Sequence, residues 1–345
     1  MTTRNGSAPS SRERVLDELR GADKLVLVTH ENPDGDALGS LVAMHGVLRA
    51  LGKDSLMFMG ADEFPLPYEY RFFVLDGLVS EAPADMGERT VVFLDCGNID
   101  RNPAEVVKRH GARILNIDHH HDNTRFGTVD HVVEDASCTA EIVWDLMRAL
   151  GVEPTPTIAD ALYVGLVTDT GRFMYENTGT RAHIMAAELI AAGVDVNAIY
   201  RRLYEDMPFS KLELLSRGLA NIRRYDEGRL TFTRLGREDF EEAGAEESYS
   251  EGIIDHLRSV QGTKVAAMAR ELLDPGKAGR TKVSLRATDG EVDVSVIARA
   301  GGGGGHRQAA GFTTGLDPDD LVAFLREQVA AQLGPRVPAV SSGAR

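Results

Sequence analysis

Acidic and histidine side chains directly follow two short apolar runs in the first third of this chain. The run 25–28 leads into His30, Asp34 and Asp36, and a later run ends at Asp95. Such runs are typical of buried strands, and the ligand sites of open α/β sheets lie where the strands end. We therefore expect these side chains to gather at one edge of a sheet.

The densest group of such residues lies at 116–123, directly after the apolar residues 113–115. The stretch is Asn-Ile-Asp-His-His-His-Asp-Asn, and it supplies Asp118, His119 and His120. One carboxylate and two imidazoles at the end of a third apolar run extend the pattern of the first two.

A further acid, Asp169, follows the apolar stretch 162–167. Carboxylates mixed with imidazoles suit manganese or related first-row ions better than calcium or magnesium, which are held by oxygen atoms alone. These Asp and His side chains are more numerous than the ligands that one metal ion needs. Two metals about 3.5–4 Å apart could share one carboxylate and clamp the attacking and leaving oxygens of a displacement at phosphorus. The pattern therefore indicates a dinuclear metal site.

The formal net charge of −15 argues against broad binding of long nucleic acid, which relies on many contacts between basic side chains and phosphates. Residues 251–311 differ, with nine Lys or Arg against seven Asp or Glu, so this segment could receive a small anion. No apolar stretch is long enough to span a bilayer, and the first residues lack the apolar core of a signal peptide. We expect a cytoplasmic protein that does not associate with membranes, with Cys96 and Cys138 reduced in its core.

The length of 345 residues predicts two domains, both of the α/β class. The N-terminal pattern predicts a parallel sheet with helices on its faces, from strands at 25–28, 55–58, 91–94 and 113–117 and helices at 11–19, 37–44, 103–110, 137–150, 157–168 and 180–192. A helical pattern at 195–220 follows. The second, smaller α/β domain is predicted from strands at 230–235, 264–273, 282–287 and 310–313 and helices at 238–243, 292–300 and 317–333. The expected boundaries are 1–20 for a tail and lead-in helix, 21–190 for the first domain, 191–224 for a helical connector, 225–335 for the second domain and 336–345 for a tail.

The motifs as a set resemble those of the DHH phosphoesterases. The matching segments are His30-x-Asn-Pro-Asp34-Gly-Asp36, Asp95, Asp118-His119-His120-x-x-Asn123 and Asp169-Thr-Gly-x-Phe173. The glycine run 301–305, followed by His306 and Arg-Gln-Ala-Ala-Gly, resembles the signature of the DHH-associated C-terminal domain. The resemblance covers roughly residues 20–330 and includes every motif in order, which makes it far more specific than one isolated match. It is strongest to the nano-RNases that are also phosphatases of adenosine 3',5'-bisphosphate (pAp), a subgroup that includes actinobacterial hydrolases of cyclic di-AMP and pApA.

The resemblance implies a ligand set for two Mn²⁺ ions, with Mg²⁺ or Co²⁺ as alternatives. It makes His30, Asp34 and Asp95 the ligands of one metal. The second metal would be held by Asp36, Asp95, His119 and Asp169, with Asp95 bridging the two ions.

The same resemblance implies that His120 faces the phosphoryl group and stabilises charge in the transition state, while Asp118 orients the two histidines. His121 lies beyond the matching pair, and we expect it to be a surface or structural residue. Asn123 could simply hold the loop after the histidines.

In the second domain, Arg258, Arg286 and His306 are candidates for binding substrate phosphates or the terminal nucleotide. The glycines Gly302, Gly303, Gly304 and Gly305 could allow a close approach of the backbone to the substrate. Each feature also has a simpler explanation, since a glycine run is more often a flexible loop and a lone arginine is most often a solvated surface charge.

Together these features predict a metal-dependent phosphodiesterase that cleaves short oligoribonucleotides or dinucleotides to mononucleotides, with pAp 3'-phosphatase activity. Its partners would be these small substrates, and the family suggests a homodimer. Two alternatives stay open, an inorganic pyrophosphatase or polyphosphatase of the same fold and a nucleotide-binding regulator without turnover. Pyrophosphatases of this fold lack the glycine-histidine signature, and a regulator would be expected to have lost metal ligands.

Overall fold

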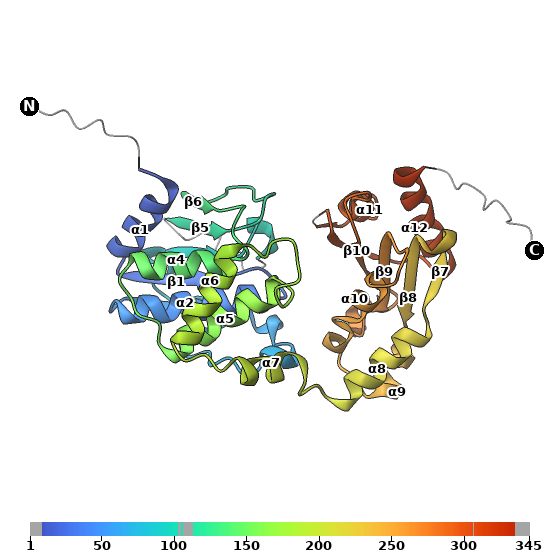
Figure 1. Cartoon of the computed structure of the whole chain (residues 1–345), viewed down its shortest axis with the longest axis horizontal. Helices are drawn as coiled ribbons and strands as arrows, with labels where there is room; N and C mark the ends of the chain where they lie inside the picture. Colours follow the sequence, from blue (N-terminus) through green and yellow to red (C-terminus); the bar gives the residue numbers. More distant parts are fainter. Residues whose placement is uncertain (1–8, 103–104, 106–112, 306, 335–345) are drawn as a thin grey trace, which may run out of the picture. The chain divides into compact units, whose positions relative to one another are not determined.

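The computed structural model describes residues 9–102, 105, 113–305 and 307–334. The chain divides into two compact units, Met1–Asp206 and Met207–Arg345 (Figure 1). The predicted helix at 103–110, apart from residue 105, and the predicted substrate residue His306 lie outside the described residues.

The N-terminal unit contains a six-stranded parallel sheet in the order β3-β2-β1-β4-β5-β6. Its strands are β1 (Lys24–Val28), β2 (Asp54–Phe58), β3 (Leu78–Val79), β4 (Thr90–Leu94), β5 (Ile114–Asp118) and β6 (Val129–Val132). The strand order reverses between β1 and β4, and ligands of open α/β sheets bind at such a switch point, beyond the carboxyl ends of the strands. The topology therefore singles out the residues that follow β1 and β4.

The described helices pack against one face of the sheet, and the side chains of its strands are buried on both faces. The helices of this unit are α1 (Ser11–Gly21), α2 (Gly35–Ala50), α4 (Thr139–Ala149), α5 (Pro156–Asp169), α6 (Thr180–Ala191) and α7 (Val196–Tyr204). Leu25 and Leu27 of β1 pack into a hydrophobic cluster with α2, α4 and α5, whereas Val26 and Val28 pack into a second cluster. Successive side chains of a strand point to opposite faces, so the continuous apolar run of β1 serves two layers.

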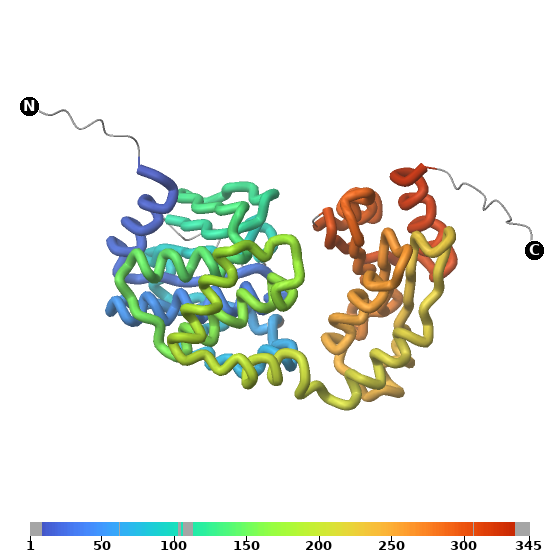
Figure 2. Tube along the Cα trace, in the orientation of Figure 1, coloured from blue at the N-terminus to red at the C-terminus, as the bar shows by residue number. Residues whose placement is uncertain are grey.

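The first helix lies beside the last strand of this sheet, as the colours of Figure 2 make visible. Ser11 Oγ of α1 lies 3.0 Å from His131 Nδ1 of β6, and Arg12 Nε donates a hydrogen bond to Asp145 of α4 at 2.5 Å. These polar contacts supplement the burial of the apolar residues Val15 and Leu19. Segments more than 100 residues apart in the sequence thus close one side of the unit.

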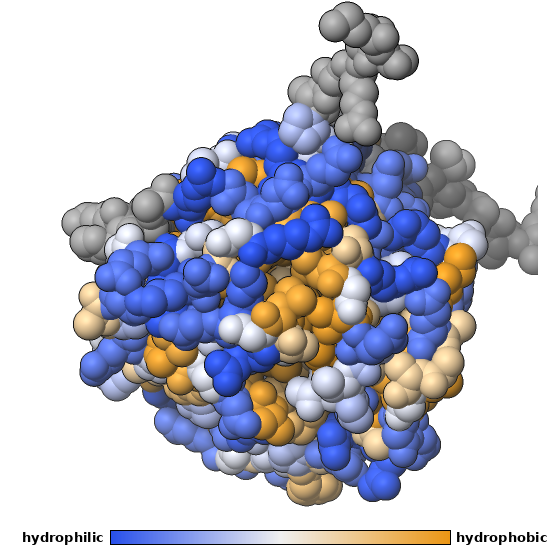
Figure 3. Space-filling view, turned by 90° about the vertical axis from the view of Figure 1, so that its left-hand side faces the viewer, coloured by the Kyte–Doolittle hydropathy of each residue, from blue (hydrophilic) through white to orange (hydrophobic). Residues whose placement is uncertain are grey.

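Figure 3 shows the side of the molecule turned toward the left in Figure 1. Hydrophilic side chains cover most of this face, and apolar side chains gather near its middle.

Among the described residues no single helix is long and apolar enough to cross a membrane. Helices α6 and α7 together reach the required length and apolar composition, but the pair is bent by 113°.

The C-terminal unit contains a mixed sheet in the order β11-β12-β10-β9-β8-β7, in which only the pair β8 and β9 is parallel. Its strands are β7 (Arg223–Tyr225), β8 (Leu230–Leu235), β9 (Val265–Glu271), β10 (Thr281–Ala287), β11 (Gly304–Gly305) and β12 (Ala309–Thr314). Its helices are α8 (Phe209–Ala220), α9 (Arg237–Ala243), α10 (Ile253–Arg258), α11 (Val294–Ala300) and α12 (Pro318–Leu333). The apolar faces of α11 and α12 share a core with the sheet. The predicted two-domain α/β fold is confirmed.

The structure differs from the sequence prediction in a few local features. The helical pattern at 195–220 is divided into α7 and α8, because Pro208 is extended (ψ 143°) and starts a new helix. Strands β3, β6, β7 and β11 and helix α10 were not predicted. These strands span two to four residues each and lie at or next to a sheet edge, where too few residues repeat for a periodic pattern to show.

Candidate metal centre

Asp34 and Asp36 lie at the start of α2, directly beyond β1. Asp34 caps the helix, and its Oδ1 accepts hydrogen bonds from the backbone N–H groups of Asp36 (3.1 Å) and Ala37 (3.0 Å). Gly35, between the two acids, has no positive φ and is the first residue of the helix. A Cβ atom at Gly35 would lie 2.4 Å from Thr168 Oγ1. Glycine is therefore needed for the close packing of α2 against α5.

The Asp36 carboxylate is buried and held by three donors. The backbone N–H groups of Thr139 and Ala140 donate to its two oxygens at 2.7 and 2.9 Å, and Ser40 Oγ donates at 3.3 Å. The two N–H groups belong to the first turn of α4, where the unpaired donors and the helix dipole favour an anion. Asp36 is thus held by two donors of α4 and by Ser40 of its own helix.

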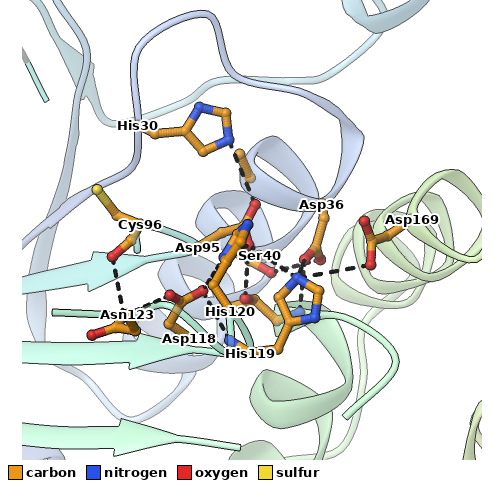
Figure 4. A network of polar contacts seen from close by, with 12 residues as sticks. His30, Asp36, Ser40, Asp95, Cys96, Asp118, His119, His120, Asn123 and Asp169 are labelled. Atoms are coloured by element: carbon orange, nitrogen blue, oxygen red, sulfur yellow. Dashed lines mark hydrogen bonds and ion pairs between the residues drawn. The ribbon is translucent and has the colours of Figure 1, made fainter. Parts of the chain in front are cut away.

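Asp95 lies at the centre of the cluster, directly after β4 (Figure 4). Its φ of +58° is uncommon for a residue other than glycine. One carboxylate oxygen is 3.6 Å from His30 Nε2, and the other is 3.6 Å from His119 Nε2 and from His120 Nδ1. Thr139 Oγ1 donates a hydrogen bond to the second oxygen at 3.0 Å. Asp95 is therefore placed to serve two neighbouring positions at once.

His30 points its Nε2 atom toward this centre because its other ring nitrogen is engaged. His30 Nδ1 lies 2.8 Å from the carbonyl oxygen of Glu31, which can only accept, so Nδ1 carries the proton. The Nε2 lone pair is then free to ligate a metal, the arrangement usual for a metal-binding histidine.

Asp118, at the end of β5, orients the histidine pair. Its Oδ1 accepts hydrogen bonds from the backbone N–H of His119 (2.8 Å) and from His120 Nδ1 (2.7 Å), and Asn123 Nδ2 donates to Oδ2 at 2.6 Å. Burial lowers the pKa of His120, but Asp118 and Asp95 outweigh it and raise this pKa to about 9. Both carboxylates thus favour the protonated form of the His120 imidazole. His121 is exposed, as expected for a residue outside the cluster.

Asp169 closes the cluster from the last residue of α5. Its Oδ2 is 3.8 Å from His119 Nε2 and accepts a hydrogen bond from Asn177 Nδ2 at 3.1 Å. Asn177 also donates to the carbonyl oxygens of Ser137 (2.8 Å) and Asp169 (3.1 Å). Asn177 thereby holds the loop after α5 against Asp169 and orients the Asp169 carboxylate.

The electrostatics of the cluster call for added positive charge. Burial, with Asp95 and Asp169 nearby, raises the pKa of Asp36 well above its ordinary value. Burial likewise raises the pKa of Asp169 to about 7, with His119 opposing and Asp95 adding to the rise. Divalent cations among these carboxylates would offset both the burial and the mutual repulsion that raise these two pKa values.

The donor atoms also have the spacing of metal ligands. Within each of three groups, ligand atoms lie within 4.8 Å of one another: His30, Asp34 and Asp95; Asp36, His119 and Asp169; and Asp95, Asp118, His119 and His120. All six predicted ligands belong to the first two groups. The mixture of carboxylate oxygens and imidazole nitrogens fits first-row divalent ions, so this cluster could hold metal.

The predicted substrate residues of the C-terminal unit lie on its sheet and on α10. Arg286 is in β10, where its Nη1 donates to the carbonyl oxygen of Leu285 at 3.1 Å, and Arg258 ends α10. The glycine run has a packing role of its own. A Cβ atom at Gly303 would lie 2.1 Å from the carbonyl oxygen of Gly311 in β12. The close approach of Gly303 to β12 therefore requires glycine at this position, independently of any contact that the run makes with a substrate.

Sequence reasoning missed Ser40, Thr139 and Asn177, which hold three of the predicted ligands by hydrogen bonds. Thr139 lies near a predicted helix start, a signal for capping but not for contact with Asp36 and Asp95. Asn177 has no such signal. Polar residues of this kind are common in loops, and only their partners distinguish them.

Comparison with known proteins agrees with this geometry. Residues 24–166 match the model of the DHH family, N-terminal domain, and residues 229–331 match that of the DHHA1 domain. The chain is 33% identical over 338 residues to a Thermus thermophilus protein named bifunctional oligoribonuclease and PAP phosphatase NrnA, which covers 95% of this chain and 98% of the relative. A Bacillus subtilis protein of the same name is 26% identical over 296 residues, covering 84% and 88% of the two chains.

A solved structure shares the fold over nearly the whole length. The crystal structure of an exopolyphosphatase-related protein from Bacteroides fragilis superposes with a TM-score of 0.84 at 23% identity, covering 93% of this chain and 96% of that chain. With both family models matched in order and a relative of 33% identity aligned almost end to end, the chain belongs to the DHH family.

Proposed function

We propose that this chain is a metal-dependent phosphodiesterase that hydrolyses short oligoribonucleotides and dinucleotides such as pApA to mononucleotides, and that it also removes the 3'-phosphate of pAp. The observation that carries this proposal is the pair of ligand groups that meet at Asp95. The names of the curated relatives agree with both activities. Cyclic di-AMP is a further proposed substrate.

In this proposal the cluster holds two Mn²⁺ ions, one at His30, Asp34 and Asp95 and one at Asp36, Asp95, His119 and Asp169. Bound ions of this kind supply Lewis acidity, polarising phosphoryl oxygens and acidifying water. Mg²⁺ or Co²⁺ could replace manganese at the same donors.

The chain's own side chains supply orientation and charge. Asp118 holds the ring of His120 and favours its protonated form, so His120 would stabilise negative charge that develops on the phosphoryl oxygens without first having to reorient. In the C-terminal unit, Arg258, Arg286 and the glycines 302–305 are proposed to contact the rest of the substrate. The acidic chain offers few basic side chains for the phosphates of a long RNA strand. The value of kcat/KM should therefore fall as the RNA grows beyond a handful of nucleotides. We also propose that the protein acts in the cytoplasm as a homodimer.

The proposal is tested by a turnover panel with chelator-treated protein, with and without added Mn²⁺. The substrates are pApA, a long single-stranded RNA, cyclic di-AMP, pAp and pyrophosphate. Manganese-dependent release of AMP from pApA supports the proposal. Phosphate release from pyrophosphate alone would favour the pyrophosphatase alternative, and binding without turnover would favour a regulator.

The variant Asp95→Asn should abolish turnover, because it weakens a donor that lies beside His30 of one ligand group and His119 of the other. Asp23→Asn is the matched control, since the Asp23 side chain is 98% exposed and lies outside the cluster. Substantial turnover by folded Asp95→Asn protein would contradict the dinuclear centre.

A further inference from the structure

Arg101 is held beside the first ligand histidine by the backbone around it. It is the last residue of a short 3-10 helix, Ile99–Arg101, in the loop that follows β4 and Asp95. The backbone N–H of Glu31 donates to the carbonyl oxygen of Arg101 at 2.7 Å, and Asn102 Nδ2 donates to the carbonyl oxygen of Thr29 at 2.6 Å. The loop after β4 is thus tied to the residues on both sides of His30.

The guanidinium of Arg101 has no carboxylate partner among the described residues, although the adjoining cluster is rich in carboxylates. Its side chain is half-buried. Arg89 shows the usual arrangement in this unit, because its buried guanidinium is hydrogen-bonded to both Asp54 and Asp85. A partly desolvated cation without such a partner is costly, and the cost falls when an anion binds beside it.

The positive charge of Arg101 acts on the cluster. Burial lowers the pKa of His120, Asp118 and Asp95 raise it, and Arg101 works against that rise. The same opposition is found at His30, whose net pKa is raised by Asp95 and Asp34 in spite of burial and of Arg101. The geometric link is the backbone, which ties Arg101 to the residue that follows His30.

The carboxylates that could neutralise Arg101 are already engaged. Asp34 caps α2, Asp118 holds the histidine pair, and Asp95 faces His30, His119 and Thr139. The anion that remains is one brought by a ligand. A planar guanidinium presents paired N–H donors that match the oxygens of a phosphate group better than an ammonium does.

We propose that Arg101 is a substrate-binding residue whose guanidinium contacts the non-bridging oxygens of the phosphate group that is cleaved. The inference rests on the proposed phosphodiesterase function and adds a cationic residue of the N-terminal unit to it. Arg101 then shares with His120 the task of balancing charge on the phosphoryl oxygens. It differs from the metal ligands in one measurable way, because it binds the anion and repels cations.

The test compares Arg101→Gln and Arg101→Lys with the matched control Arg125→Gln. Arg125 also follows a strand of the same sheet, but it is exposed and paired with Glu134 at 3.0 Å. Three quantities are measured for each protein: Mn²⁺ affinity of the chelator-treated form, AMP affinity of the Mn²⁺-loaded form by calorimetry, and kcat/KM on pApA.

For Arg101→Gln we expect AMP affinity and kcat/KM to fall at least about tenfold, as for the loss of a hydrogen bond to a charged group, while Mn²⁺ affinity is unchanged or higher. Arg101→Lys should recover part of the loss, and Arg125→Gln should match the wild type. Unchanged AMP affinity in Arg101→Gln, or a fall in Mn²⁺ affinity parallel to the fall in kcat/KM, would overturn the inference.

The two proposals fail separately. A wild-type protein that binds AMP but does not hydrolyse pApA would contradict the proposed function, and a weaker AMP affinity of Arg101→Gln would still support a phosphate-binding role. Turnover by the wild type together with wild-type behaviour of Arg101→Gln would contradict only the role of Arg101.

Discussion

Replacing Thr139 with valine should weaken metal binding while leaving the N-terminal unit folded. Thr139 reaches two carboxylates from different ligand groups, with its backbone N–H on Asp36 (2.7 Å) and its hydroxyl on Asp95 (3.0 Å). Valine keeps the shape and the backbone N–H, so only the contact with Asp95 is lost. The side chain is fully buried, which leaves water little access to replace the missing donor.

The size of the effect follows from the kind of hydrogen bond that is removed. A hydrogen bond to a charged group contributes about 1.5–3 kcal/mol, which corresponds to roughly 10- to 150-fold in an equilibrium constant. Loss of a residue that orients a metal ligand typically costs about 10- to 100-fold in metal affinity or activity. We therefore expect the Kd for Mn²⁺ to rise about 10- to 100-fold in Thr139→Val.

The assay is a calorimetric titration of chelator-treated protein with Mn²⁺, together with a urea unfolding curve of the metal-free form. Thr139→Ser restores the hydroxyl and should restore most of the affinity. Thr155→Val is the control for loss of a threonine hydroxyl at a helix start, because Thr155 caps α5 away from the cluster. It should lower stability by about 1 kcal/mol without changing Mn²⁺ affinity. The reasoning is refuted if Thr139→Val binds Mn²⁺ like the wild type, or if Thr139→Ser loses as much affinity as Thr139→Val.

Three further predictions follow from the contacts of single residues. His120→Ala should keep its Mn²⁺ stoichiometry and lose about 100- to 1,000-fold in kcat, as for removal of one group that stabilises charge in a transition state, and loss of metal would show that His120 is a ligand. Arg286→Ala should lose at least about tenfold in kcat/KM on pApA but not on bis(p-nitrophenyl) phosphate, and equal losses on both substrates would argue against a nucleotide contact. Contacts with Arg89 and Lys24 lower the pKa of Asp85 to about 2, so they stabilise the fold above the ordinary carboxyl pKa and lose this effect as the pH falls toward 2. Asp85→Asn should therefore lower the urea midpoint at pH 7, and the difference from the wild type should shrink as the buffer is acidified below about pH 4; a constant difference would contradict the ionic origin.

The sequence by itself was enough to predict the α/β fold and the place of the candidate site. Acids and histidines after the apolar runs that became β1, β4 and β5 had to meet, because parallel strands end at the same edge of a sheet. The chemistry also followed from residue types, since carboxylates and imidazoles gathered at one place favour a divalent metal. The helical pattern before Asp169 predicted an acid at a helix end, which is where α5 has it.

Only the tertiary structure decided which residues hold these ligands in place. Thr139 lies 103 residues from Asp36 and 44 residues from Asp95, and no local pattern links a threonine to partners so distant in the chain. No sequence pattern distinguished Arg101, and only the structure shows its half-buried position and its lack of a carboxylate partner among the described residues. Gly303 could not be assigned to strand packing before β12 was placed beside it. In each case the role depends on a neighbour that is brought close only when the sheet and its helices pack together, because side-chain hydrogen bonds and steric limits act over a few ångströms of space and not along the sequence.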